Sequence, residues 1–194
     1  MSETSKQLKG LNPILDHIWN EFQKDTRNGG TERYRGWSDR REYPILFSLP
    51  RIYGVSNVVE SGTCNGCSAL VMAYNLPQSG KVYTYDIVDK PQVYVGTDLE
   101  SKIVRTVDPL GFQRILGAIP PLEGETMFFI DGDHSKEGVE KDISTVKRLA
   151  VRGDVIVFHD TIKWKDVQPA MEEHFQGERM YTLRTENGFG VVEL

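Results

Sequence analysis

Short apolar runs alternate with helical patterns from Val55 onward. The apolar runs predict strands at Asn57–Glu60, Val82–Asp86, Ile103–Val107, Met127–Asp131 and Val155–His159. The segments between and after them predict helices at about Ser68–Asn75, Pro109–Ile119, Lys136–Val151 and Lys165–Phe175. Strands that are separated by helices pair in parallel, and the helices cover the sheet. The pattern therefore predicts an α/β fold with a largely parallel sheet and helices on both faces.

The end of the chain departs from this alternation. Two strand-like runs, Met180–Arg184 and Gly188–Val192, are joined through the short segment Thr185-Glu186-Asn187. A connection this short makes the two strands antiparallel neighbours in a hairpin. We therefore expect this hairpin to give the sheet one antiparallel edge.

The length of 194 residues suits a single domain with one core. We expect one domain over residues 1–194, in which residues 1–54 form an N-terminal helical or lid segment. Asn12 and Pro13 are a suitable start for a helix in that segment. Thr26–Glu42 is polar and rich in arginine, so it is either a solvated loop or a lid over the cofactor or an anionic acceptor.

Composition argues against several classes of protein. The net charge of −5 disfavours a broad nucleic-acid-binding face. No apolar run approaches the roughly 20 residues that a membrane-spanning helix needs, and the polar N-terminus has no apolar signal-peptide core. We therefore expect a cytoplasmic protein with no nucleic-acid partner and no membrane partner.

A glycine-rich turn follows the first predicted strand. Glu60 ends that strand, and Gly62, Thr63 and Gly66 fall in the turn before the next helix. Glycine lets backbone N–H groups at the start of a helix approach a ligand closely. The spacing E-x-G-x-x-x-G differs from the G-x-G-x-x-G of dinucleotide-binding proteins. We expect this turn to bind a cofactor.

Several residues around the turn have two interpretations each. Asp86 ends the second strand, where a carboxylate can accept both hydroxyls of a ribose, a role that does not separate one nucleotide-like cofactor from another. Ser68 is expected either to bind the cofactor or to cap the helix, and Asp108 either to bind the cofactor or to form a turn. Cys64 and Cys67 are the only cysteines; they are a redox or metal-binding pair, or they simply belong to the turn.

A second polar cluster follows the fourth and fifth predicted strands. Asp131 and His134 come after one apolar run, and His159 and Asp160 come after the next. Burying such groups without partners would cost several kcal/mol. We expect Asp131, His159 and Asp160 to hold a divalent ion. Carboxylates favour Mg²⁺, whereas an imidazole in the set would favour Mn²⁺, Fe²⁺ or Zn²⁺.

His134 is the best candidate for a general base. An ordinary imidazole has a pKa of about 6.5, which suits proton removal near neutral pH. Asp133 is expected either to orient His134 or to be a further metal ligand, and Lys136 is the rival base. Trp164 either forms a wall of the acceptor site or packs on the surface.

The glycine turn resembles the first motif of class I S-adenosylmethionine-dependent methyltransferases. The pair of motifs I-D-G-D-H-S and F-H-D-T resembles the metal-dependent branch of O-methyltransferases that acts on small molecules. That branch includes the macrolide sugar O-methyltransferases and the cephalosporin hydroxylase-like group; catechol and caffeoyl-CoA O-methyltransferases are more distant. The resemblance implies a Rossmann-like sheet of seven strands in which the last is antiparallel.

The resemblance also implies roles for individual residues. The cofactor would be bound by Glu60, Gly62, Thr63, Gly66, Ser68, Asp86, Asp108 and Asp131. The metal ligands would be Asp131, which ends the fourth strand, and the adjacent pair His159-Asp160, which ends the fifth. The base falls on His134, which is a histidine in the macrolide group and a lysine in the catechol group. The fifth-strand pair is usually two oxygen ligands, so His159 departs from the pattern.

We therefore expect a methyltransferase that uses S-adenosylmethionine, and a divalent metal, to methylate a hydroxyl of a sugar, polyol or phenol. The alternatives are a metal-independent methyltransferase, a non-catalytic S-adenosylmethionine-binding protein and an NAD-type oxidoreductase with unusual glycine spacing. No long insertion is available to form an acceptor wall. The N-terminal segment or a second subunit must form it, and we expect a homo-oligomer.

Overall fold

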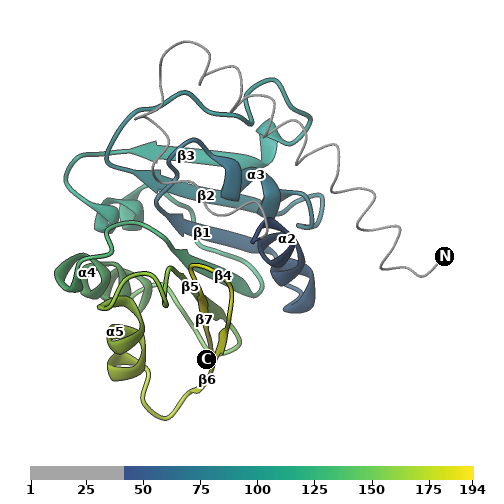
Figure 1. Cartoon of the computed structure of the whole chain (residues 1–194). Helices are drawn as coiled ribbons and strands as arrows, with labels where there is room; N and C mark the ends of the chain where they lie inside the picture. Colours follow the sequence, from purple (N-terminus) through teal and green to yellow (C-terminus); the bar gives the residue numbers. More distant parts are fainter. Residues whose placement is uncertain (1–41) are drawn as a thin grey trace.

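The computed structural model describes residues 42–194, and a seven-stranded sheet forms its centre (Figure 1). The strands are β1 (Asn57–Ser61), β2 (Lys81–Asp86), β3 (Ile103–Val107), β4 (Thr126–Ile130), β5 (Val155–His159), β6 (Arg179–Leu183) and β7 (Phe189–Glu193). They lie in the order β3-β2-β1-β4-β5-β7-β6. Strands β1 to β5 pair in parallel, and β7 is antiparallel to both β5 and β6. This confirms the predicted sheet with its single antiparallel strand.

Helices cover both faces of the sheet, as predicted. Figure 1 shows α2 (Tyr43–Ile52) and α3 (Cys67–Ala73) on one side, and α4 (Lys136–Val146) and α5 (Val167–His174) on the other. Ser135 caps α4, because its Oγ accepts a hydrogen bond from the backbone N–H of Gly138 at 3.1 Å.

The segment predicted as a helix over Pro109–Ile119 is instead a short 3₁₀ helix, η2 (Phe112–Gly117). Gly111, at a φ of +106°, and the Pro120-Pro121 pair bracket it, so few residues remain that can continue an α-helix. A second 3₁₀ turn, η1 (Glu100–Lys102), precedes β3. Helix α2 falls within the predicted N-terminal segment of residues 1–54. The expected helix at Asn12 lies outside the described residues, and so does the segment predicted as a solvated loop or a lid, Thr26–Glu42, except for its last residue. That residue, Glu42, is buried and so is not part of a solvated loop.

The central strands are buried on both faces. Met127 and Phe129 of β4 pack with α2 and α3, whereas Phe128 and Ile130 pack with α4 and α5. All four side chains are at most 3% exposed. Burial of such a side chain stabilises the fold by about 1.5–3 kcal/mol. The faces of the sheet are therefore filled with apolar side chains, and polar groups gather at the ends of the strands.

The carboxyl ends of three neighbouring strands lie side by side. Ser61 at the end of β1 pairs with Ile130 of β4, and Ile130 pairs with Phe158 of β5. Residues that follow these strands are thus delivered to one edge of the sheet, which is where α/β proteins bind their ligands. Within residues 42–194, no helix is long and apolar enough to cross a membrane.

Candidate active site

The glycine turn after β1 packs directly on the end of β4. Gly62 has a φ of +96°, and a Cβ at this position would lie 2.1 Å from the carbonyl oxygen of Asp131. The backbone N–H groups of Gly62 and Thr63 donate to the carbonyl oxygen of Tyr85 at 2.9 and 3.0 Å. Gly66, at a φ of +77°, then precedes α3. Only glycine fits at position 62, because any side chain would collide with the backbone of the neighbouring strand.

Glu60 is fully buried beneath this turn. Ser68 and Thr84 donate their hydroxyl protons to its two carboxylate oxygens, and Thr84 also contacts the hydroxyl of Thr63 at 2.6 Å. Burial raises the pKa of Glu60 to about 7, although the two hydrogen bonds oppose the shift. Ser68 therefore serves Glu60 in this structure and does not cap α3, whose N-cap is Gly66.

Asp86, at the end of β2, is bonded to the backbone of the glycine turn. Its Oδ2 accepts from the N–H of Cys64 at 2.7 Å, and its Oδ1 accepts from the N–H of Val88 at 2.9 Å. A carboxylate has about four acceptor positions, so Asp86 retains capacity for further donors. Cys64 and Cys67 are both free thiols.

Asp108 follows β3 and makes the contacts of a turn residue. Its carboxylate accepts from the N–H of Leu110 at 2.9 Å and pairs with Nε of Arg114 at 3.1 Å. The hydrogen bond from Leu110, assisted by Arg114, lowers the pKa of Asp108. These contacts favour the turn interpretation of Asp108 over the predicted contact with a cofactor.

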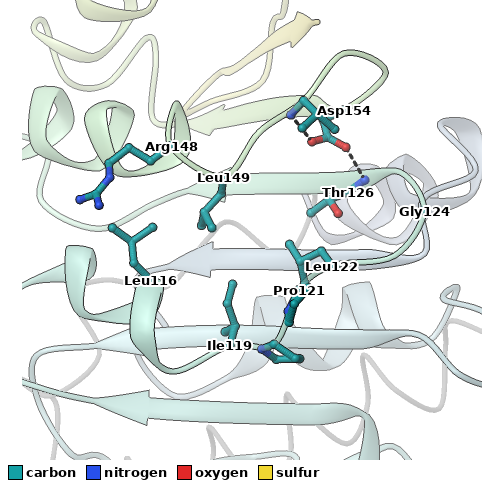
Figure 2. Close-up of a pocket in the computed structure, with 11 residues that line it drawn as sticks. Leu116, Ile119, Pro121, Leu122, Gly124, Thr126, Arg148, Leu149 and Asp154 are labelled. Atoms are coloured by element: carbon teal, nitrogen blue, oxygen red, sulfur yellow. Dashed lines mark hydrogen bonds between the residues drawn. The ribbon is translucent and has the colours of Figure 1, made fainter.

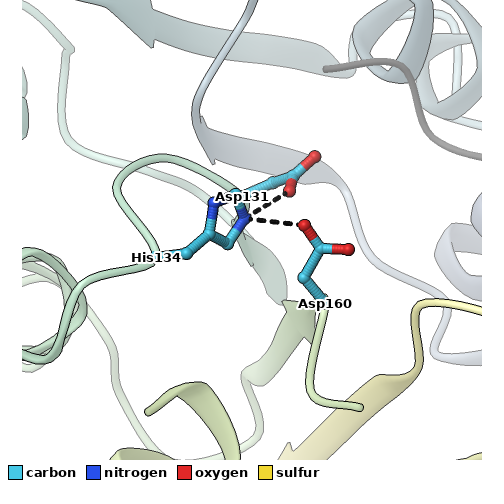
Figure 3. A group of neighbouring side chains, drawn as sticks. All are labelled: Asp131, His134 and Asp160. Atoms are coloured by element: carbon cyan, nitrogen blue, oxygen red, sulfur yellow. Dashed lines mark hydrogen bonds and ion pairs between the residues drawn. The ribbon is translucent and has the colours of Figure 1, made fainter. Parts of the chain in front are cut away.

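Asp131, His134 and Asp160 form a compact cluster beside the turn (Figure 3). Nε2 of His134 lies 3.3 Å from Oδ1 of Asp131 and 3.0 Å from Oδ2 of Asp160. Burial lowers the pKa of His134, but the hydrogen bonds to the two carboxylates outweigh it and raise the pKa to about 9. Trp164 covers the imidazole, with the two rings 5.5 Å apart and inclined by 9°. The indole remains 47% exposed, so its position suits the predicted wall of an acceptor site.

Asp160 shows signs of strain and of incomplete bonding. Its φ is +62°, a left-handed conformation that costs a residue other than glycine about 1–3 kcal/mol. The residue is 4% exposed, yet its Oδ1 has no hydrogen-bond partner among residues 42–194. Such features persist in proteins where the surrounding structure enforces them, and they cluster at functional sites.

His159 is bonded through both ring nitrogens. Nδ1 lies 2.9 Å from Oδ1 of Asp131, and Nε2 lies 2.9 Å from Oε2 of Glu42. Burial lowers the pKa of His159, but the charge of Asp131 and the hydrogen bonds to both acids raise it to about 10. Neither nitrogen is free to bind a metal. Among residues 42–194, the side chains placed to hold a metal are those of Asp131, His134 and Asp160, and the contacts of His159 disfavour its predicted role as a ligand.

Glu42 is the site residue that the sequence did not reveal. It is 1% exposed, immediately before α2, and besides His159 it accepts hydrogen bonds from the hydroxyl of Thr185 and from the backbone N–H and side-chain amide of Asn187. Burial favours the neutral acid, but these hydrogen bonds bring its pKa down to about 2. An acid before an apolar, proline-containing helix carries no local signal of a partner at His159.

Asp133 and Lys136 make contacts outside the acid–histidine cluster. Oδ1 of Asp133 accepts from the N–H of Ser135 at 2.9 Å and so shapes the start of α4. Nζ of Lys136 lies 3.6 Å from Glu140 on the exposed side of that helix. These contacts favour His134 over Lys136 as the base.

A hollow of about 370 Å³ lies at the opposite edge of the sheet, near the amino ends of β4 and β5 (Figure 2). Its lining combines apolar side chains, among them Leu116, Ile119 and Leu149, with the polar side chains of Arg148 and Asp154. Both carboxylate oxygens of Asp154 in its wall are bonded to backbone N–H groups, those of Thr126 and Val151, at 2.8 Å. The hollow is thus separate from the polar cluster and presents no comparable chemistry.

Comparisons with known proteins agree with this geometry. A family model described as a methyltransferase domain matches residues 59–161, a span that holds the glycine turn and both strand-end clusters. Tricin synthase 2 of Oryza sativa subsp. japonica is 28% identical over 167 residues, which cover 78% of this chain and 54% of that protein. The chain thus spans about half the length of this curated relative.

Solved structures share the fold. An O-methyltransferase from Bacillus cereus in complex with SAH has a TM-score of 0.73 at 19% identity, covering 94% of this chain and 91% of its own. The O-methyltransferase TomG from Streptomyces achromogenes, involved in tomaymycin synthesis and in complex with SAM, has a TM-score of 0.69 at 17% identity, covering 83% and 82%. The family model matches residues 59–161, whereas these structures share the fold over 83–94% of the chain.

Proposed function

This chain belongs to the methyltransferase-domain family, and from that premise we propose that it transfers the methyl group of S-adenosylmethionine to a hydroxyl of a small molecule. One observation carries the proposal: the backbone of Gly62 packs against Asp131, the first member of the acid–histidine cluster. A cofactor in the glycine turn would therefore present its reactive end to the cluster. The relatives named above, an O-methyltransferase with SAH and one with SAM, support the same chemistry.

The donor site would use the residues of the turn and of the strand ends. Asp86 would accept the ribose hydroxyls, and the backbone at Gly62, Thr63 and Gly66 would allow close approach of the amino acid end. Glu60 would act beneath them through its hydrogen bonds with Ser68 and Thr84. Asp131 would border the sulfonium, while a contact of Asp108 with adenine would require its bond to Arg114 to give way.

A divalent cation fits the cluster. Asp131 and Asp160 offer carboxylate oxygens, which Mg²⁺ prefers. Oδ1 of Asp160 is a buried acceptor with no hydrogen bond among residues 42–194, only a 3.6 Å ion pair with Nδ1 of His159, and a cation would satisfy it. When bound, the cation would polarise the acceptor hydroxyl and balance the charge of the carboxylates. Asp131 and Asp160 would hold it, and the imidazole of His134, which lies within reach of the same point, would stay uncoordinated when it acts as the base.

His134 would receive the proton. The acceptor hydroxyl gives its proton to Nε2, its oxygen forms a bond to the methyl carbon, and the sulfur keeps the electron pair of the broken bond. The products are a methyl ether and S-adenosylhomocysteine. For this task His134 must be neutral, but the two carboxylates hold its pKa near 9. A cation bound to Asp131 and Asp160 would offset their negative charge and lower the pKa of His134, so that the imidazole could accept the proton. Positioning of the two reactants supplies much of the rate in such transfers.

A metal-independent methyl transfer is the second candidate, and in it a protonated His134 would balance charge instead of acting as the base. It is favoured by the two histidines that already face the carboxylates, since His134 and His159 have raised pKa values of about 9 and 10. Two imidazolium groups would balance most of the negative charge of Asp131, Asp160 and Glu42. The acids would then bind acceptor hydroxyls directly.

The acceptor would be a sugar, polyol or phenol hydroxyl that lies against Trp164, whose indole is half exposed beside His134. Because the Trp164 side chain is 47% exposed, a second subunit or the N-terminal segment would complete the wall, and a homo-oligomer is proposed. A cytoplasmic location is proposed from the two free cysteines, since reducing compartments keep thiols unpaired.

Thermal melting with separate additions tests the proposal. S-adenosylhomocysteine should raise the melting temperature, because a ligand at a hundred times its Kd stabilises by about 2.7 kcal/mol. Mg²⁺ should add to that effect. A shift with NAD alone would end the methyltransferase proposal. A shift with S-adenosylhomocysteine that no divalent metal changes would favour the metal-independent candidate.

A further inference from the structure

Glu42 and His159 form a buried ion pair between distant parts of the chain. The two residues are 117 positions apart, and their side chains are 1% and 3% exposed. Glu42 precedes α2, His159 ends β5, and the turn between β6 and β7 adds Thr185 and Asn187. The pair therefore joins three elements behind the acid–histidine cluster.

Both carboxylate oxygens of Glu42 accept two hydrogen bonds each. Oε2 of Glu42 accepts from Nε2 of His159 at 2.9 Å and from the amide of Asn187 at 2.8 Å, while Oε1 accepts from Thr185 and from the N–H of Asn187. The carboxylate is thereby fixed in position as well as in charge. Four donors around one carboxylate leave it no alternative orientation.

The ring of His159 is held just as firmly. Carboxylate oxygens lie at both nitrogens, so the ring donates from each of them. Phe189 packs on its face with the ring centres 4.9 Å apart, and Phe129 lies 6.1 Å away. Nδ1–H points to Oδ1 of Asp131 at 2.9 Å, and Oδ1 of Asp160 lies farther away, at 3.6 Å.

Stability does not explain a pair of this kind. Moving two charged groups out of water costs several kcal/mol each, and an apolar pair of the same size is often as stable or more stable. The position of the pair offers a different explanation. His159 shares Oδ1 of Asp131 with His134, so the orientation of His159 decides how Asp131 faces the rest of the cluster.

We propose that Glu42 is a positioning residue: it holds His159 so that Nδ1–H fixes the carboxylate of Asp131 for the reaction. This inference rests on the proposed function, because it assigns the positioned carboxylate to the methyl-transfer site. Glu42 itself touches neither the glycine turn nor His134 in the contacts described, so it acts only through His159. A partner of this type, bonded behind a functional carboxylate–histidine pair, typically contributes 10–100-fold to activity or metal affinity.

The test compares Glu42→Gln with Asp154→Asn. Asp154 is a matched control: it is 4% exposed, it is bonded to two backbone N–H groups, and it lies at the opposite edge of the sheet. Both substitutions replace a buried acid by its amide and are expected to lower the melting temperature. Turnover is measured at a temperature at which circular dichroism shows both variants folded.

We expect Glu42→Gln to lower kcat by roughly 10–100-fold, with little change in the affinity for S-adenosylhomocysteine. Asp154→Asn should keep the wild-type kcat. Equal losses of kcat in the two variants would overturn the proposal, because they would trace the effect to stability alone. A loss confined to cofactor affinity would overturn it as well.

Nuclear magnetic resonance gives a readout without turnover. The chain has 4 histidines, so the ring N–H signals of His159 can be assigned by their loss in His159→Gln. In the wild type both ring N–H protons of His159 should be hydrogen-bonded and slow to exchange. In Glu42→Gln the Nε2–H proton should exchange quickly and the Nδ1–H signal should shift. Signals that are the same in Glu42→Gln as in the wild type would refute the proposal that Glu42 fixes the ring of His159. Intact signals in a protein that methylates no hydroxyl would instead refute the proposed function.

Discussion

The stability of Glu60→Gln relative to the wild type should increase as the pH rises from acidic to alkaline values. Glu60 is fully buried, and its pKa rises from 4.5 to about 7 on folding. Below pH 4.5 the acid is neutral in both states, so it costs nothing. As the pH rises from 4.5 to 7, the unfolded chain releases the proton while the folded chain keeps it, and stability is lost.

The size of this loss follows from the pKa difference. At about 1.4 kcal/mol per pH unit, ionised Glu60 costs the folded protein about 3 kcal/mol above pH 7. Glutamine carries no charge at any pH and fits the same contacts. Its carbonyl oxygen can accept from Ser68, and its amide can donate to Thr84, whose own proton can turn to Thr63. The substitution therefore removes the charge and keeps one hydrogen bond from each end of the amide. The second N–H of the amide has the same cost at every pH and cancels in a comparison of two pH values.

The assay is urea unfolding of both proteins, without cofactor, at pH 4.5 and pH 8.5. The free energy of unfolding of Glu60→Gln minus that of the wild type should increase by about 3 kcal/mol between the two pH values. Asp142, whose pKa burial raises to about 6, titrates in the same range but is present in both proteins and cancels. Glu173→Gln, at an exposed position, is the control. A difference that stays flat or decreases with pH would show that Glu60 is ionised at little cost in the fold.

Three further substitutions test the site. Gly62→Ala should destabilise the fold by about 2 kcal/mol or more and abolish binding of S-adenosylhomocysteine in calorimetry, because its Cβ would collide with the backbone of Asp131; wild-type affinity would refute the assigned turn. Asp86→Ala should weaken that binding by roughly tenfold or more through loss of the charged acceptor, and an unaltered Kd would remove the ribose assignment. His134→Ala should reduce kcat by about 10²–10⁴-fold while cofactor affinity stays near that of the wild type; a retained kcat would place the base elsewhere.

The sheet could be predicted from the sequence because its signals are local. Each strand is an apolar run, and the glycine turn and the Thr185–Asn187 hairpin connection have their own short patterns. The 3₁₀ helix η2 was predicted as an α-helix because of its apolar pattern. That pattern does not take into account that only eight residues lie between Gly111 and Pro120, which both interrupt helices. Local patterns therefore predict the order and type of most elements, but they do not predict whether a short helix is an α-helix or a 3₁₀ helix.

The cluster could be predicted only in part. The acids after β4 and β5 were found because parallel strands bring their ends to one edge. His159 was predicted as a metal ligand, but one of its nitrogens is bonded to Glu42, which lies 117 positions away in the sequence. His134 lies with the two acids in its place. A contact over that distance arises from the tertiary packing of α2 against the sheet, and no spacing or periodicity in the chain reports it.

The contact between Gly62 and Asp131 has a consequence for how such an enzyme could diverge. The gap between the donor turn and the acid–histidine cluster is set by main-chain atoms, so side-chain substitutions have little power to widen or narrow it. New acceptors would have to be accommodated from the open side, around Trp164 and the loop that carries it. A library aimed at altered acceptor choice should accordingly vary residues 162–166 and leave the turn untouched.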